Sequence, residues 1–242
     1  MQKLPQEISP CPIVEATIEI KFATKLPHNA ILGIIYNAFK DEFSNIESLP
    51  ITQIPEEVRL NDPNFKFKVF HRFAGDIYSI QVGFDVITLH CNSPYSGWEA
   101  FFSEIIKFVD RVNSTNIISN VISVSLRYIN FFQDDIFKNT NVSIEIMGNK
   151  VEDGKSVMRF ELPHNEYIQV FQIANNTEIE DQKQGVKKIG SVLDITIIQA
   201  YPQNFFEDSS KIIDKMHVEE KNIFFGLLNE DFLLKLKPSY KS

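Results

Sequence analysis

The sequence predicts an α+β fold that is mainly antiparallel sheet, and three observations lead to this class. Apolar and polar residues alternate over several segments, most clearly between Ile13 and Phe22. Other segments repeat apolar residues at helical spacing, as between Pro27 and Phe43. Strand-like segments also follow one another through short turns, as at 74–76, which is typical of an antiparallel meander.

The first half is predicted to contain a strand, a helix, a meander and a second helix. The strand covers 13–22 and places every second residue from Val14 on one apolar face. Pro27 opens a helix to about Phe43, and the segment 44–64 is mostly loop because Pro50, Pro55 and Pro63 interrupt it. The meander follows at 65–73 and at 77–91, the latter as one long strand or as two short ones broken near Gly83.

The second helix of this half is predicted to start at Ser93 and Pro94, with Ser93 as N-cap. Its predicted core-facing stripe consists of Trp98, Phe102, Ile105, Ile106, Val109 and Val112. An alternative use of Tyr95, Trp98, Phe101 and Phe102 is a platform on which bases stack, although the helical spacing favours core packing.

The second half loosely repeats this plan. Strands are predicted over 121–132, 144–147, 157–162, 167–174 and 191–201, and a polar, mobile hairpin loop over 175–188. One long helix or two close the chain between Phe205 and Leu236. Each half is thus a strand, a meander and a closing helix, which predicts related halves at residues 1–115 and 116–242, or one continuous domain.

Charge and composition narrow the possible partners. The 242 residues carry a net charge of −8, which disfavours nucleic acid and anionic membrane surfaces. No apolar run approaches the roughly 18 residues that span a bilayer, and the N-terminal segment lacks the apolar region of a signal peptide. Two cysteines, Cys11 and Cys91, without a Cys-x-x-Cys motif predict a reducing, cytoplasmic location.

Catalytic and cofactor motifs are missing from the sequence. The five histidines are scattered, so no metal site is predicted, and no phosphate-binding or nucleophile-elbow motif occurs. Cys91 could act as a nucleophile with His90 or His71 as base, but a buried apolar thiol in a sheet is the favoured interpretation. We therefore predict no catalytic residue, no metal and no cofactor.

A charged pattern supports an alternative. Glu15, Glu19 and Lys21 share one face of the first strand. Lys66, Lys68 and Arg72 are predicted to share one face of another strand, and Arg127 and Arg159 add two cations from the second half. Charged residues that point from several strands into one tunnel resemble the triphosphate tunnel enzymes, whose first strand reads Glu-x-Glu-x-Lys. Here the strand offers Thr17, Glu19 and Lys21, so one acid of that signature is replaced.

Four short motifs, in order, resemble a sporadically distributed bacterial family of about this length. They are Pro12-Ile13-Val14-Glu15-Ala16, Tyr95 with Trp98, Leu126-Arg127-Tyr128-Ile129-Asn130, and His217 followed by Phe224, Leu228 and Asn229. The resemblance implies no established activity or cofactor. It marks Glu15, Arg127, Tyr128, Asn130 and His217 as motif positions, and the patchy distribution of the family resembles that of phage-defence or toxin-neutralising genes.

Two functions follow as hypotheses. The first is a cytoplasmic binding protein that acts through a protein partner, with an oligomeric state that the sequence leaves open. The second is a metal-dependent phosphohydrolase or nucleotide-processing enzyme with a charged sheet interior. In the structural interpretation, Arg127 lies in or beside the core and pairs with Glu15 or Glu161.

Overall fold

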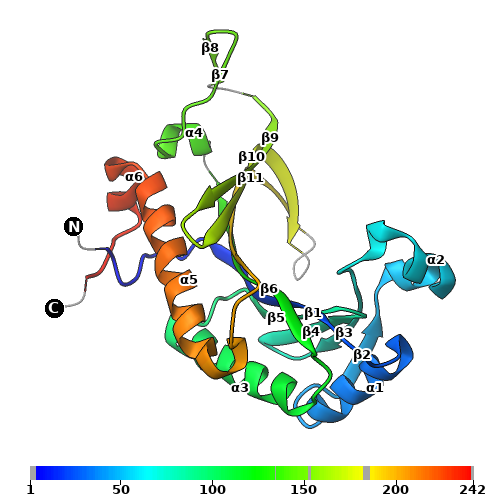
Figure 1. Ribbon diagram of the computed structural model, residues 1–242. Helices are drawn as coiled ribbons and strands as arrows, with labels where there is room; N and C mark the ends of the chain where they lie inside the picture. The colour runs from blue at the N-terminus through cyan, green and yellow to red at the C-terminus, as the bar shows by residue number, and fades with distance from the viewer. Residues whose placement is uncertain (1–3, 134, 152–153, 182–185, 241–242) are drawn as a thin grey trace. The chain divides into compact units, whose positions relative to one another are not determined.

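A computed structural model describes residues 4–133, 135–151, 154–181 and 186–240 (Figure 1). Its large sheet has the strand order β2-β3-β4-β5-β1-β6-β11-β10-β9, and β7 and β8 form a separate small sheet. The α+β class with a mainly antiparallel sheet is confirmed. The strands are β1 (Ile13–Ala23), β2 (Asn45–Ser48), β3 (Val69–Ala74), β4 (Tyr78–Gly83), β5 (Val86–Asn92), β6 (Asn120–Phe132), β7 (Glu145–Ile146), β8 (Asn149–Lys150), β9 (Ser156–His164), β10 (Tyr167–Asp181) and β11 (Val186–Ala200).

Helices occupy the intervening segments. The α-helices are α1 (His28–Phe39), α2 (Glu56–Asn61), α3 (Trp98–Ser114), α4 (Ile136–Asn139), α5 (Phe205–Leu227) and α6 (Glu230–Lys235), and the 3₁₀ helices are η1 (Pro50–Gln53) and η2 (Pro63–Phe65). None of the helices in the described ranges is long and apolar enough to cross a membrane.

The chain forms two compact units. The meander unit comprises residues 15–126 and 198–214, and the hairpin unit comprises the chain up to Val14, residues 127–197 and the chain from Lys215. The sequence predicts a different division, into two related halves at 1–115 and 116–242 or into one continuous domain. That division remains a prediction.

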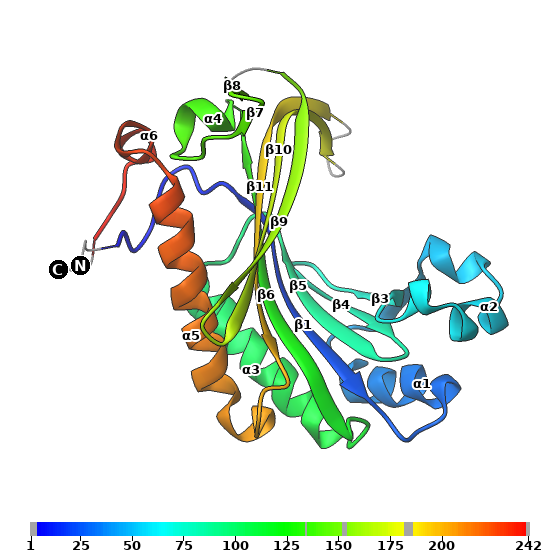
Figure 2. The ribbon, with the colours of Figure 1, turned by 45° about the horizontal axis from the view of Figure 1, so that its top comes forward.

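The core of the meander unit lies between its sheet and two helices. Ala16, Ile18 and Ile20 of β1 are fully buried, as the alternation predicts. Helices α1 and α3 cover this face of the strands (Figure 2). The Phe39 ring of α1 packs on the Phe108 ring of α3, with 5.8 Å between their centroids. The opposite face of β1 carries polar residues, so one strand separates an apolar side from a polar side.

Two predicted boundaries in this unit are wrong. Helix α1 ends at Phe39, and the segment 44–64 forms β2, η1, α2 and η2 instead of loop. Its prolines start helices: Pro50 and Pro63 stand at the first helical turn, and Pro55 precedes α2. The fixed φ of proline is compatible with the first turn of a helix. These prolines therefore mark the starts of short helices and do not indicate a loop.

The start and the buried stripe of α3 also differ from the prediction. Gly97, with φ of 87°, is the N-cap in place of Ser93. The helix thus begins at Trp98, where Trp98 and Phe102 are only half-buried. The buried stripe consists of Phe101, Ile105, Phe108, Val109 and Val112. Phe101 and Phe108 are buried in place of Trp98, Phe102 and Ile106, because the helix faces the sheet slightly rotated from the assumed phase.

The loop predicted over 175–188 is wrong for its described part. Strand β10 continues to Asp181 and β11 begins at Val186, while residues 182–185 lie outside the described residues. The buried Asn175 side chain fixes this region: its Oδ1 accepts from Ser191 Oγ at 2.7 Å and from Ile136 N at 3.1 Å. A β-hairpin with solvent-exposed faces can consist mostly of polar residues. The small number of apolar residues in this segment therefore did not indicate a loop.

Two helices close the chain, one of the alternatives that the sequence left open. Asn229 separates them and caps α6, since its Oδ1 accepts from Phe232 N at 2.8 Å. The two ends of the described chain lie together in the hairpin unit (Figure 1). There Gln6 N donates to Ser239 O at 2.6 Å.

Candidate functional site

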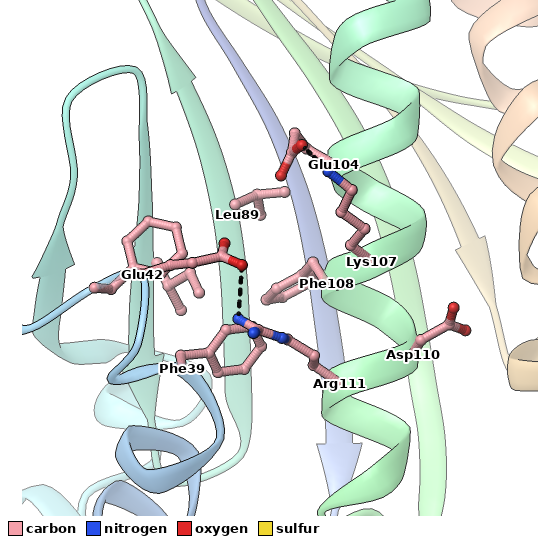
Figure 3. Close-up of a pocket in the computed structure, with 10 residues that line it drawn as sticks. Phe39, Glu42, Leu89, Glu104, Lys107, Phe108, Asp110 and Arg111 are labelled. Carbon is pink, nitrogen blue, oxygen red and sulfur yellow. Dashed lines mark hydrogen bonds and ion pairs between the residues drawn. The ribbon is translucent and has the colours of Figure 1, made fainter.

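A cleft in the meander unit lies between the C-terminal end of α1 and one flank of α3 (Figure 3). Its volume is about 340 Å³. The floor is apolar and consists of Phe39, Phe43, Ile80, Leu89 and Phe108. The rim is charged and consists of Glu42, Glu104, Lys107, Asp110 and Arg111. An apolar floor with a polar rim is the usual composition of a binding pocket.

Arg111 is held in place on the rim. Its guanidinium lies 2.5 Å from Asp41 Oδ2 and 3.3 Å from Glu42 Oε1. It also lies over the Phe39 ring, 5.5 Å from the centroid. The hydrogen bond from Arg111 lowers the pKa of Asp41 below its ordinary value. A guanidinium with two carboxylates and an aromatic face has little freedom, so this part of the rim is pre-organised.

The other side of the rim is formed by a helical ion pair. Lys107 Nζ lies 2.6 Å from Glu104 Oε1, one turn away on α3, as the dashed line in Figure 3 marks. The Glu104 hydrogen bond raises the pKa of Lys107. Together with Arg111, these residues occupy one face of α3 beside its buried stripe.

Sequence reasoning missed this cleft. Because the first helix was predicted to run to Phe43, Asp41 and Glu42 were assigned to that helix, whereas they follow the end of α1. In addition, Arg111 lies 70 residues from Asp41 in the sequence, so their contact was not apparent. The available signal was the repeat of charge at Glu104, Lys107 and Arg111 along one helix face. That repeat is also typical of any solvated helix, so it could not distinguish a site.

Glu15, one of the predicted positions, belongs to a polar cluster on the outer face of β1 and β5. Antiparallel pairing puts Thr17 opposite His90. His90 Nδ1 lies 3.2 Å from Glu15 Oε1 and 3.1 Å from Thr17 Oγ1, and its Nε2 lies 2.8 Å from Thr88 Oγ1. Both ring nitrogens therefore have partners, which orients the imidazole on the sheet.

Glu19 and Lys21 extend this polar face. Lys21 Nζ lies 3.2 Å from Glu19 Oε1, which also accepts from Ser125 Oγ at 3.4 Å. Lys21 further lies 5.5 Å from the centroid of the Phe67 ring. These contacts are local ion pairs and hydrogen bonds of a sheet face.

The remaining charged residues of the tunnel alternative lie on different elements. Lys66 and Lys68 precede β3, which starts at Val69, so the predicted common strand face with Arg72 is wrong. Arg72 Nη1 lies 4.0 Å from Glu47 Oε2 on the neighbouring edge strand. Arg159 pairs with Glu161 on β9. The backbone of 65–68 turns before the strand, with Phe67 at φ of 59°, and the alternation of its side chains misled the prediction.

Arg127 has a partner that sequence reasoning missed. Its Nε donates to Asp194 Oδ1 at 2.9 Å and its Nη2 to Oδ2 at 2.5 Å. The Arg127 side chain is 41% exposed and that of Asp194 is 7% exposed, so the carboxylate is the buried member. Glu161, one predicted partner, forms its ion pair with Arg159 instead. A pair between Arg127 and Glu15 remains a prediction.

Tyr128, Asn130 and His217 belong to the hairpin unit. The buried Tyr128 places its hydroxyl 3.3 Å from His217 Nδ1 of α5. Burial lowers the pKa of His217 to about 3, so its imidazole is neutral near pH 7. Asn130 is buried and its Nδ2 donates to Leu193 O at 3.2 Å. Tyr128 and His217 thus contact each other as packed core residues, whereas the buried Oδ1 of Asn130 has no hydrogen-bond partner among the described residues.

A buried carboxyl group in α5 was also missed. Glu220 is 5% exposed and lies between Met216 and Phe224 at helical spacing, within the buried stripe. Burial raises its pKa to about 8. Hydrophobic periodicity treats such a glutamate as a solvent-facing residue, so no sequence signal singled it out.

Cys91 and the histidines do not form a catalytic arrangement among the described residues. Cys91 is buried, and its Sγ lies 3.5 Å from Ser96 Oγ, whereas the neighbouring His90 points to the opposite, polar face. In the described ranges, no three His, Cys, Asp or Glu side chains lie close enough to hold a metal ion. Trp98 packs on Phe102 at 5.0 Å and Tyr95 on Phe101 at 6.1 Å between ring centroids.

The chain was also compared with known proteins. No protein-family model matches it, and no curated protein matches it.

Proposed function

We propose that this chain is a non-enzymatic binding protein and that the cleft between α1 and α3 receives an apolar side chain of a protein partner. The observation that carries the proposal is the apolar floor beneath an Arg111 that Asp41 and Glu42 hold in place. A pocket of about 340 Å³ accommodates one large anchor side chain and the backbone next to it.

The rim sets the chemistry of the partner. Glu42, Glu104 and the Asp41 that pairs with Arg111 lie around the floor with the cations Lys107 and Arg111, whereas the Asp110 side chain points away (Figure 3), so the surroundings of the floor carry an excess of negative charge. The chain as a whole also carries −8. A partner segment with an apolar anchor beside a Lys or Arg would complement both, and the long-range field would accelerate its association.

The biological setting belongs to the proposal as well. We place the protein in the bacterial cytoplasm, where its two free cysteines stay reduced. The resemblance to a sporadically distributed family supports a role in a phage-defence or toxin-neutralising system.

Affinity capture with a matched pair of variants tests the proposal. Glu42→Lys/Glu104→Lys reverses two carboxylates of the rim, and Glu207→Lys/Asp214→Lys makes the same charge change at exposed positions of α5. We expect a stoichiometric partner with the unaltered protein and the control, and at least about tenfold less with the rim variant. Melting temperatures of all three proteins check that the fold is retained.

Two outcomes would contradict the proposal. One is a partner that the rim variant captures as well as the control does. The other is strong thermal stabilisation by a nucleoside triphosphate with Mg²⁺ or Mn²⁺, which supports the phosphohydrolase hypothesis instead; saturation at one hundred times the dissociation constant corresponds to about 2.7 kcal/mol.

A further inference from the structure

Strand β9 of the hairpin unit is an exposed sheet edge. It ends the strand order of the large sheet, with β10 as its neighbour (Figure 2). Val157 is 66% exposed, Phe160 42% and Leu162 50%. A nine-residue edge with apolar side chains and unpaired backbone groups invites pairing with another strand.

The hairpin turn decides which backbone groups face outward. Two residues, Asn165 and Glu166, connect the strands, and His164 pairs with Tyr167. The pair that closes a two-residue turn is hydrogen-bonded, and hydrogen-bonded pairs alternate along an antiparallel ladder. The N–H and C=O groups of 157, 159, 161 and 163 therefore point to the free edge. Pro163 has no N–H, so residue 163 offers only its C=O group at this edge.

The sequence of β9 is self-complementary in one antiparallel register. With Phe160 on a twofold axis, Arg159 lies opposite Glu161 of the second copy, and Glu161 lies opposite its Arg159. Met158 and Leu162 face each other in the same way, and the two Phe160 rings meet at the axis. Opposite charges and aromatic or aliphatic pairs are the favoured cross-strand neighbours.

We propose that β9 pairs with β9 of a second copy of this chain, in the register centred on Phe160, to give a twofold homodimer with a continuous sheet. Arg159 and Glu161 supply both backbone donor and acceptor at the edge, so the two central residues give hydrogen bonds and charge pairing together. The same pattern argues against an unrelated strand, which would not match Arg159 and Glu161 in order. The site is separate from the cleft residues and does not depend on the proposed function.

Charge exchange tests the register. Arg159→Glu and Glu161→Arg each place like charges opposite one another, and we expect each to weaken the dimer at least about tenfold in sedimentation equilibrium. The double variant Arg159→Glu/Glu161→Arg restores opposite charges and should dimerise. An equimolar mixture of the two single variants should form a heterodimer for the same reason. Lys187→Glu, on β11, is the control and should leave the dimer intact.

A disulfide measures the register directly. In a Cys11→Ser background, Phe160→Cys should form an intermolecular disulfide on oxidation, because the Cα atoms at a twofold, non-hydrogen-bonded pair lie about 4.5 Å apart. Leu162→Cys is the matched control, since it faces Met158 of the other copy and should cross-link poorly. An unaltered protein that stays monomeric at all concentrations overturns the proposal. A dimer whose dissociation constant is unchanged by both charge reversals overturns it as well. So does a dimer in which Leu162→Cys cross-links as readily as Phe160→Cys.

Discussion

Arg127 and Asp194 form a bidentate ion pair in which the carboxylate is buried and the guanidinium is partly exposed. Two nitrogens of Arg127 donate to the two oxygens of Asp194, at 2.9 Å and 2.5 Å. Asp194 is 7% exposed, so its charge depends on this arginine for compensation. Arg127, one of the motif positions in the sequence, thus supports a buried carboxylate structurally.

Arg127→Ala should destabilise the protein. Removal of the guanidinium leaves the buried Asp194 carboxylate without this partner, which we expect to lower the free energy of unfolding by about 2–4 kcal/mol. The control is Lys187→Ala, which breaks the exposed pair with Glu178 and should cost at most about 1 kcal/mol. Urea unfolding of both variants gives the comparison, and an unaltered midpoint for Arg127→Ala would show that the pair does not support the fold.

The neutral His217 should make stability fall in acid. Its pKa is about 3 in the folded protein against 6.5 as the ordinary value, so the unfolded chain takes up a proton first as the pH drops. The stabilisation is complete above pH 6.5 and is lost between pH 6.5 and 3, by about 3–5 kcal/mol. His217→Gln removes this group, and its unfolding free energy should depend less on pH across that window. An equal slope in the two proteins would refute this assignment.

Glu220 should act in the opposite direction. Its pKa is about 8 when folded against 4.5 as the ordinary value, so the unfolded chain loses its proton first as the pH rises. Stability therefore declines between pH 4.5 and 8 and stays low above pH 8. Glu220→Leu should raise the free energy of unfolding at pH 8.5 by about 3–5 kcal/mol relative to its effect at pH 4. Glu219→Gln, one residue away and hydrogen-bonded to Gln169, should show no such gain.

Gly190 should tolerate no side chain. A Cβ at this position would lie 2.2 Å from the Phe132 carbonyl oxygen and 2.6 Å from the Phe131 ring. We expect Gly190→Ala to cost several kcal/mol, on the order of 2–4, because the backbone of two neighbouring strands would have to separate. Gly33→Ala is the control: its Cβ meets nothing within 4 Å in α1, and the variant should gain about 0.5–1 kcal/mol. Differential scanning calorimetry of the two alanine variants distinguishes these directions.

Local pattern was enough for much of the fold. The alternation from Ile13 to Phe22 predicted both a strand and its buried face, since a strand between apolar core and solvent must have period two. The break near Gly83 and the division of the closing helix were alternatives that turn residues and helical spacing left open, and the structure decided both. Local pattern was insufficient to predict where α3 starts and which of its faces is buried. It was also insufficient to predict how far β10 extends through its polar residues.

The candidate site was mostly outside the reach of the sequence. Glu15 was singled out as a charged strand residue, yet its neighbour His90 became evident only through the β1–β5 register. The cleft depends on Arg111 meeting Asp41, which a chain separation of 70 residues conceals.

The sequence by itself determined the class, the alternation of strand faces and the order of most elements, because these depend on neighbours within one turn or one strand. Tertiary structure alone decided that Asp194 is the partner of Arg127, that Glu220 is buried with Met216 and Phe224, and that β9 is an edge. Each of these depends on which distant segments lie side by side. The arrangement of distant segments is determined by how the whole chain buries its apolar surface on folding. A local pattern of residues does not contain this information, because the contacts join positions far apart in the sequence.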